Sequence, residues 1–316
     1  MSGFTITGGV SFSGAVSMSD APAPAPENTA AWFGGGYSIS GLKSTVDRIT
    51  YATDTATASI RGPLSLARYD LAAAGNTTDA WFGGGAPGPM STVDRITFAT
   101  DTATASIRGP LSLARDALAA ASNTTDGWFG AGLNGSNRST VDRITFATDT
   151  ATASVRGPLS LARWGLAAAG NTTDAWFGAG NPGPFSTVDR ITYATDTATA
   201  SVRGPLSLAR RSLAAAGNTT DAWFGGGYGP GPKSTVDRIT YATDTATASV
   251  RGPLSLARFH LAAASNTTDA WFGGGYSSGD RSTVDRITYA TDTATASVRG
   301  SLSQARYSLA AAGGIQ

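Results

Sequence analysis

Short apolar runs separated by polar turns make up most of the chain, and no stretch has the spacing of a helix. In one representative unit we expect strands at residues 71–75, 80–85, 92–98 and 103–108. The third of these is rich in β-branched residues, which favour strands. The segments between them combine Asn, Thr, Asp, Gly and Pro, which favour turns. The pattern therefore predicts four short strands per unit.

The same unit recurs along the chain. The heptapeptide Ser-Thr-Val-Asp-Arg-Ile-Thr occurs six times at intervals of 47 or 48 residues, beginning at Ser44, Ser91, Ser139, Ser186, Ser234 and Ser282. A fixed period of this size indicates a repeat architecture, and four strands per period are typical of a propeller blade. We therefore predict an all-β fold, a six-bladed β-propeller with four-stranded antiparallel blades.

The two ends of the repeat region complement each other. The first unit begins with the Trp-Phe segment at residues 30–34 and lacks the preceding Leu-Ala-Ala-Ala-Gly segment. That segment occurs instead at residues 309–313, where no Trp-Phe segment follows it. We expect the C-terminal strand to complete the first blade, which closes the ring and covers its edge.

Two places differ between otherwise near-identical units: the dipeptide after Ala-Arg and the loop after the glycines. Because antiparallel strands alternate in direction, both places should emerge on one face of the ring. Aromatic residues and Arg dominate binding hot spots, so we predict that this variable face binds a partner. The dipeptides contribute Tyr69, Asp70, Asp116, Trp164, Arg211, Phe259, His260 and Tyr307, and the loops contribute Tyr37, Leu133, Asn181, Tyr228 and Tyr276.

The alternative is that these loops vary because nothing restrains them. The Asn-Thr-Thr-Asp and Ala-Thr-Asp-Thr turns, which should lie on the opposite face, recur without such variation. This contrast favours a binding role for the variable face.

Residues 1–29 lie outside the repeat. Apolar side chains recur there with a period of two, which indicates a strand with one apolar face; they are Phe4, Ile6, Val10, Phe12, Val16 and Met18. The Ala-Pro run that follows is typical of a semi-rigid spacer. We predict a β arm at 1–20 that anchors the protein by strand addition, a linker at 21–29 and a propeller at 30–316. Alternatively, the arm folds back on its own propeller or is disordered.

The order of motifs resembles the kelch repeat over residues 30–313. Ala-Arg-x-x-Leu-Ala-Ala-Ala precedes Gly-Gly, a Val-Asp strand and a Thr-Asp-Thr turn. Kelch blades usually carry a Trp after that turn, whereas this chain has an alanine at each aligned position: Ala56, Ala103, Ala151, Ala198, Ala246 and Ala294. We expect the Trp-Phe pair of the second strand to supply the aromatic filling instead. The nearly identical sequences of the repeats also resemble those of propeller proteins of marine bacteriophages, cyanophages in particular.

This second resemblance, together with the arm, implies a non-enzymatic structural or appendage protein on the surface of a virion, in the capsid or the tail. Its implied partners are other virion proteins, through the arm, and a host surface protein or glycan, through the variable face. The alternative is a cellular kelch-type scaffold or a carbohydrate-binding propeller.

Composition argues against several other classes. The chain has no Cys and His260 is its only histidine, so ligands for zinc or copper catalysis are missing. The Asp and Arg of Val-Asp-Arg recur in every unit, which favours structural ion pairs. We therefore expect no enzyme activity, no cofactor and no metal.

Charge and hydropathy narrow the expected partners further. The net charge is +1 and charged residues make up 14%, without the basic stripe of a nucleic-acid-binding protein. No stretch approaches the ~20 apolar residues of a membrane span, and the N-terminus lacks the pattern of a secretory signal. We expect a soluble protein that binds no nucleic acid.

Overall fold

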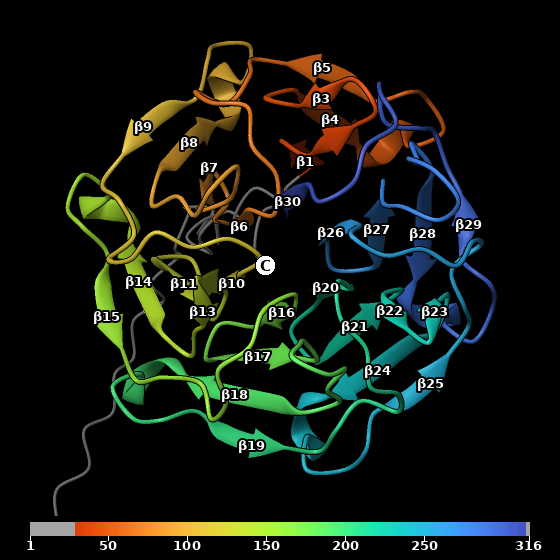
Figure 1. Cartoon of the computed structure of the whole chain (residues 1–316). Helices are drawn as coiled ribbons and strands as arrows, with labels where there is room; N and C mark the ends of the chain where they lie inside the picture. The colour runs from red at the N-terminus through yellow and green to blue at the C-terminus, as the bar shows by residue number, and fades with distance from the viewer. Residues whose placement is uncertain (1–28, 314–316) are drawn as a thin grey trace, which may run out of the picture.

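The computed structural model describes residues 29–313, which form a ring of six blades around a central axis (Figure 1). Each blade is a sheet of four antiparallel strands, so the predicted six-bladed propeller is confirmed. From the axis outwards, the first three blades are β30 (Ala310–Gly313), β1 (Ala30–Gly34), β4 (Val46–Thr50) and β5 (Ser59–Arg61); β6 (Ala72–Gly75), β7 (Asp79–Gly83), β8 (Val93–Thr97) and β9 (Ser106–Arg108); and β10 (Ala119–Ser122), β11 (Asp126–Gly130), β14 (Val141–Thr145) and β15 (Ser154–Arg156).

The other three blades repeat this order. They are β16 (Ala167–Gly170), β17 (Asp174–Gly178), β18 (Val188–Thr192) and β19 (Ser201–Arg203); β20 (Ala214–Gly217), β21 (Asp221–Gly225), β24 (Val236–Thr240) and β25 (Ser249–Arg251); and β26 (Ala262–Ser265), β27 (Asp269–Gly273), β28 (Val284–Thr288) and β29 (Ser297–Val298). Blades are numbered 1 to 6 in this order below.

Short elements connect the main strands. The third strand of each blade runs into a 3-10 helix: η1 (Tyr51–Thr53), η2 (Phe98–Thr100), η3 (Phe146–Thr148), η4 (Tyr193–Thr195), η5 (Tyr241–Thr243) and η6 (Tyr289–Thr291). Small hairpins in three loops are β2 (Tyr37–Ser38) with β3 (Gly41–Leu42), β12 (Leu133–Asn134) with β13 (Ser136–Asn137), and β22 (Tyr228–Gly229) with β23 (Gly231–Pro232). Within residues 29–313, no helix is long and apolar enough to cross a membrane.

All four strands of the representative unit are shorter than the sequence predicts, and the second and fourth have a clear structural reason. Strand β7 ends at Gly83 because Gly84 and Gly85 follow with φ of +73° and +112°, which are not strand conformations. Strand β9 begins only at Ser106, because the N–H of Ala105 donates to the carbonyl of Pro63 in the preceding blade. That segment joins two blades and does not extend its own sheet.

The ring closes between the two ends of the described chain. Strand β30 pairs antiparallel with β1, with Trp32 opposite Ala312 and Gly34 opposite Ala310. The predicted closure by the C-terminal strand is therefore confirmed.

The hydrophobic core lies between neighbouring blades. Trp81 of blade 2 stacks on Phe146 of blade 3, with ring centroids 3.8 Å apart. An equivalent stack fills every interface, and the Trp271–Tyr51 pair joins blade 6 to blade 1. The phenyl ring of Phe82 packs on Gly34 of the preceding blade, where a Cβ would lie 2.8 Å from it. The second strand thus supplies the aromatic filling, as expected.

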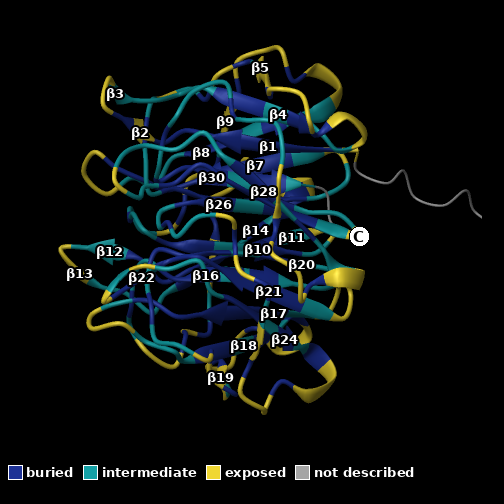
Figure 2. Ribbon diagram, turned by 90° about the vertical axis from the view of Figure 1, so that its right-hand side faces the viewer, coloured by how far each residue is buried: buried dark blue, intermediate teal, exposed yellow. Residues whose placement is uncertain are grey.

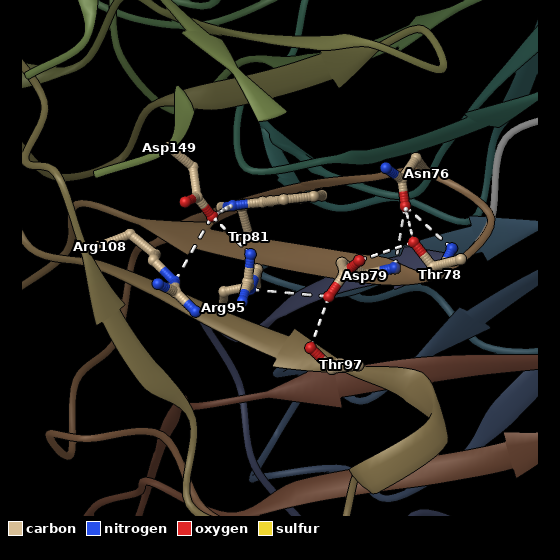
Figure 3. A network of polar contacts seen from close by, with 8 residues as sticks. All are labelled: Asn76, Thr78, Asp79, Trp81, Arg95, Thr97, Arg108 and Asp149. Carbon is tan, nitrogen blue, oxygen red and sulfur yellow. Dashed lines mark hydrogen bonds and ion pairs between the residues drawn. The ribbon is translucent and has the colours of Figure 1, made fainter. Parts of the chain in front are cut away.

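A carboxylate bridges each pair of blades beside this stack (Figure 3). Asp149, in the Thr-Asp-Thr turn of blade 3, accepts hydrogen bonds from Trp81 Nε1 at 2.8 Å and Arg95 Nη1 at 3.1 Å, and Arg108 Nε lies 3.5 Å away. All three partners belong to blade 2. We call this arrangement the inter-blade latch.

The latch recurs around the whole ring. Its aspartates are Asp54, Asp101, Asp149, Asp196, Asp244 and Asp292, each bound by a Trp and two Arg of the preceding blade. Because each carboxylate faces two guanidinium groups, this position does not suit a cation.

A second ion pair is fully buried inside each blade. Arg115 Nη2 lies 3.0 Å from Asp142 Oδ2 and donates to the carbonyl of Phe129, and both charged side chains are 0% exposed. Ser112 donates to the same carboxylate through its N–H and its hydroxyl. The Asp of Val-Asp-Arg therefore pairs with the Arg of Ala-Arg, while its own neighbouring Arg serves the latch. Breaking such a fully buried pair by removing one partner typically costs 3–5 kcal/mol, so the Arg115–Asp142 pair and its equivalents stabilise the fold.

We predict that ending the chain before Tyr307 will strongly destabilise the ring. The shorter chain lacks β30 and the buried Leu309, and it exposes the inner edge of β1. Each kcal/mol lost lowers the midpoint of a domain this large by about 2–4 °C, so thermal unfolding followed by circular dichroism should show a fall of more than ~10 °C. A chain ending at Gly313 is the control. A single sharp transition at the control's midpoint would mean that β30 does not close the ring.

Candidate functional site: the variable face

The two variable places of each unit meet on one face of the ring. Tyr69 follows Ala-Arg and Ala86 begins the loop, and the two residues exchange backbone hydrogen bonds of 3.1 and 2.8 Å. The equivalent bridges are Asp116–Leu133, Trp164–Asn181, Arg211–Tyr228, Phe259–Tyr276 and Tyr307–Tyr37. In side view the small hairpins of these loops lie at one end of the molecule and the 3-10 helices at the other (Figure 2). The predicted grouping of the two places is thus what the structure shows.

The second residue of each variable dipeptide belongs to a ring of backbone hydrogen bonds. The N–H of Asp70 donates to the carbonyl of Ser308, and each further member donates to the member in the preceding blade, over distances of 2.6–2.8 Å. The members are Asp70, Ala117, Gly165, Ser212, His260 and Ser308, all with φ between +50° and +64°. This left-handed conformation costs roughly 1–2 kcal/mol for a residue with a Cβ, so the ring bonds must hold it. We call this feature the mouth ring.

Aromatic side chains form a continuous arc around the mouth ring. Neighbours touch in the order Tyr69, Tyr37, Tyr307, Tyr276, Phe259 and Tyr228, with ring centroids 5.0–5.7 Å apart. Arg211 extends the arc, because its guanidinium lies 5.2 Å from the ring centroid of Tyr228 and 5.6 Å from that of Trp164. Such edge-to-face and cation–π contacts fix rings in place while leaving part of each ring free to bind.

All thirteen predicted face residues are at least partly exposed, and Tyr37 is the most exposed at 36%. The structure brings the aromatic residues and Arg211 into the arc. It places Asp116 and Leu133 together in blade 3, outside the arc, and Asp70 and His260 in the mouth ring. The predicted anchor residues fall within residues 1–28, outside the described residues.

His260 lies beside a serine and an aspartate without forming a catalytic triad. Ser308 Oγ lies 3.0 Å from His260 Nδ1, and Asp70 Oδ1 lies 3.6 Å from the same nitrogen. A triad uses the two ring nitrogens separately, one for the hydroxyl and one for the carboxylate. Burial lowers the pKa of His260, which Asp70 opposes and Arg211 reinforces. This cluster therefore lacks the geometry that activates a serine.

A groove opens between blades 6 and 1 at the edge of the arc. It has a volume of about 710 Å³ and is lined by Tyr37, Tyr276, Tyr307, Asp280 and Gln304, among others. Sequence reasoning missed Gln304. Its signal is a departure from the repeat, since the equivalent residue of the other five units is Leu66, Leu113, Leu161, Leu208 or Leu256.

A narrow central channel, by contrast, offers little chemistry. Its walls are the innermost strands, whose lining residues are Leu, Ala, Gly and a few Ser, with Asn and Thr at one end. Across residues 29–313, no three His, Asp or Glu side chains gather closely enough to hold a metal ion.

Comparisons with known proteins leave the family open. No protein-family model matches the chain, and no curated protein matches it. The resemblance to kelch repeats and to phage propellers therefore stays a prediction.

We predict that Asp116→Asn stabilises the protein in a pH-dependent way. Burial, together with the nearby Asp70, raises the pKa of Asp116 from 3.8 to about 6. The folded state thus holds this proton more tightly than the unfolded chain, so ionised Asp116 opposes folding. The gain in melting temperature should be largest above pH 6 and shrink as the pH falls towards 4. Calorimetry of both chains at pH 8 and pH 4.5 measures it, and an equal gain at the two pH values would contradict the raised pKa.

Proposed function

We propose that this chain is a non-enzymatic recognition protein: a kelch-like propeller that a virus particle displays and that binds the host surface through its variable face. The observation that carries the proposal is the aromatic arc. Seven aromatic side chains from neighbouring blades, with Arg211 between Tyr228 and Trp164, form one connected, partly exposed surface. Aromatic and Arg side chains are the residues that most often dominate binding energy.

The separation of framework and face supports a binding role for the arc. The latch residues are the same in every blade and the core residues nearly so, with Phe or Tyr stacked on each Trp, whereas the side chains of the arc come from positions at which the blades differ. A chain that repeats its framework so closely while varying one surface is suited to carry a specific surface on a regular support.

The display part of the proposal rests on the N-terminal sequence. An arm with alternating apolar residues at 1–20 and an Ala-Pro spacer after it match an anchor joined to a displayed domain. The resemblance to phage propellers points to a virus particle as the support.

Particle composition and host adsorption test the proposal together. We compare virus particles carrying the full chain, a chain without residues 1–20, and the triple variant Tyr69→Ala, Trp164→Ala and Phe259→Ala. Immunoblots should find the full chain and the triple variant in particles and should not find the arm deletion. Adsorption to host cells should fall at least tenfold with the triple variant, because truncating several hot-spot side chains at ≥2 kcal/mol each removes most of the binding energy.

The matched control is Ile107→Ala, Val155→Ala and Val202→Ala, which truncates three exposed side chains on the outer strands. Both triple variants should melt close to the parent, since none of these side chains is buried. Absence of the full chain from particles would contradict the display role and favour a cellular scaffold. Unchanged adsorption with the face variant would contradict the binding role of the arc.

A further inference from the structure

We infer that the groove between blades 6 and 1 is a binding site for a neutral saccharide. The inference rests on the proposed function, because the groove belongs to the variable face and its ligand would be a sugar of the recognised surface. With a volume of about 710 Å³, it lies within the 300–1,000 Å³ range of ligand pockets.

Three tyrosines supply surfaces on which a sugar ring can pack. Tyr276 and Tyr307 meet at 5.4 Å with an interplanar angle of 74°, and Tyr37 meets Tyr307 at 5.6 Å and 54°. In such steeply inclined pairs the edge of one ring meets one face of the other, and the opposite face of that ring is not covered by the pair. The C–H face of a pyranose is apolar and suits such a ring, while its hydroxyl groups require hydrogen bonds at the edges.

The groove provides those hydrogen-bonding groups unpaired. Within the described residues, the three tyrosine hydroxyls and the Gln304 amide make no hydrogen bond to the protein. Asp280 Oδ2 accepts the N–H of Ile39 at 2.8 Å, which ties the two loops together and leaves Oδ1 free. The Tyr307 hydroxyl is protonated at neutral pH and can donate, and burial and the nearby Asp280 raise its pKa further. Hydroxyl, amide and carboxylate groups together match a ligand that both donates and accepts.

The charge of the groove favours neutral sugars over acidic ones. Asp280 is the one charged residue among those that line the groove in the described structure, and no Lys or Arg lines it. Two cationic groups beside the groove are already bonded to its serines: Lys43 Nζ donates to Ser40 Oγ at 2.6 Å and Arg281 Nη2 donates to Ser278 Oγ at 3.0 Å. A phosphorylated or acidic ligand would meet the Asp280 carboxylate in the groove itself. A neutral saccharide meets no such repulsion.

The groove also marks where the repeat is broken. Leucines at the position of Gln304 are partly solvent-exposed elsewhere, as at Leu66 (48%) and Leu161 (39%). Gln304 replaces this exposed apolar group by an amide only where the groove lies, beside Asp280, which no other loop carries at this place. Both departures from the repeat lie in the groove between blades 6 and 1, so we expect one such site per chain.

Saturation-transfer NMR on the full chain tests this site, with maltotriose, mannotriose and chitotriose as probes. We expect transfer to the ring protons of at least one probe, and an at least tenfold weaker affinity for the Gln304→Leu and Tyr276→Ala chains. Gln304→Leu restores the residue of the other five units, so the fold should tolerate it. Ile107→Ala, which truncates an exposed side chain on the outer strand of blade 2, is the control and should leave the affinity unchanged.

Two results would overturn the site: no transfer from any of the three probes at millimolar concentration, or affinity that survives both groove substitutions. Failure here is distinguishable from failure of the proposed function. If no sugar binds but adsorption still depends on the aromatic arc, only the groove's ligand is wrong. If a sugar binds in the groove while particles lack the protein, the site stands and the display role fails.

Discussion

The inter-blade latch is the interaction on which the rest of the structure depends. A blade of four strands, with three to five residues in most of them, is too small to be stable alone. Each latch carboxylate therefore takes its hydrogen bonds and cationic partners from the preceding blade, as Asp149 does from Trp81, Arg95 and Arg108. The same tryptophan stacks on the aromatic ring that follows the next blade's third strand. One Trp thus links the polar and apolar contacts of each interface.

The two faces of the ring are held together by different chemistry. On the face with the 3-10 helices, side chains make the contacts: Asp79 accepts from Thr97, and Asn76 accepts the N–H groups of Thr78 and Asp79 (Figure 3). On the variable face, the contacts that recur in every blade are backbone bonds, in the mouth ring and in the bridges such as Tyr69–Ala86. Side-chain contacts there belong to single blades, as between Asp280 and the N–H of Ile39. Side chains that hold the fold cannot vary, whereas positions held by backbone bonds can. This difference explains why variation is confined to one face.

This difference between the faces also changes what the constant turns imply about binding. The constancy of the Asn-Thr-Thr-Asp and Thr-Asp-Thr turns has a structural cause, so by itself it is no sign that the other face was selected for binding. Support for binding comes instead from what occupies the permissive positions. Tyr37, Tyr276 and Tyr307 are not unrelated loop residues, because they contact one another across a blade boundary.

Sequence periodicity was sufficient to predict the number of blades, the closure by residues 309–313 and the face on which the variable residues lie. It could not predict the latch, because Trp81 and Asp149 are 68 residues apart and only the ring geometry pairs them. The sequence could not predict the mouth ring either, because a backbone hydrogen bond requires no particular side chain. Residues as different as Asp70 and Gly165 both belong to the ring. The sequence shows Gln304 as a single departure from Leu. Only the structure shows that it lines a groove together with the neighbouring loop and Asp280.

We conclude that backbone bonds are the contacts that every blade shares on the variable face, so the side chains that vary there serve binding rather than folding. A chain in which every blade carries the dipeptide Trp164-Gly165 and the loop of residues 181–185 tests this most directly by its thermal unfolding. Glycine accepts the left-handed conformation of the mouth ring without strain, and the replaced residues include no member of a latch or of an inter-blade aromatic stack. We expect one cooperative transition within a few degrees of the parent's. A broad transition, or a midpoint lower by more than ~10 °C, would show that the varied side chains hold the ring together.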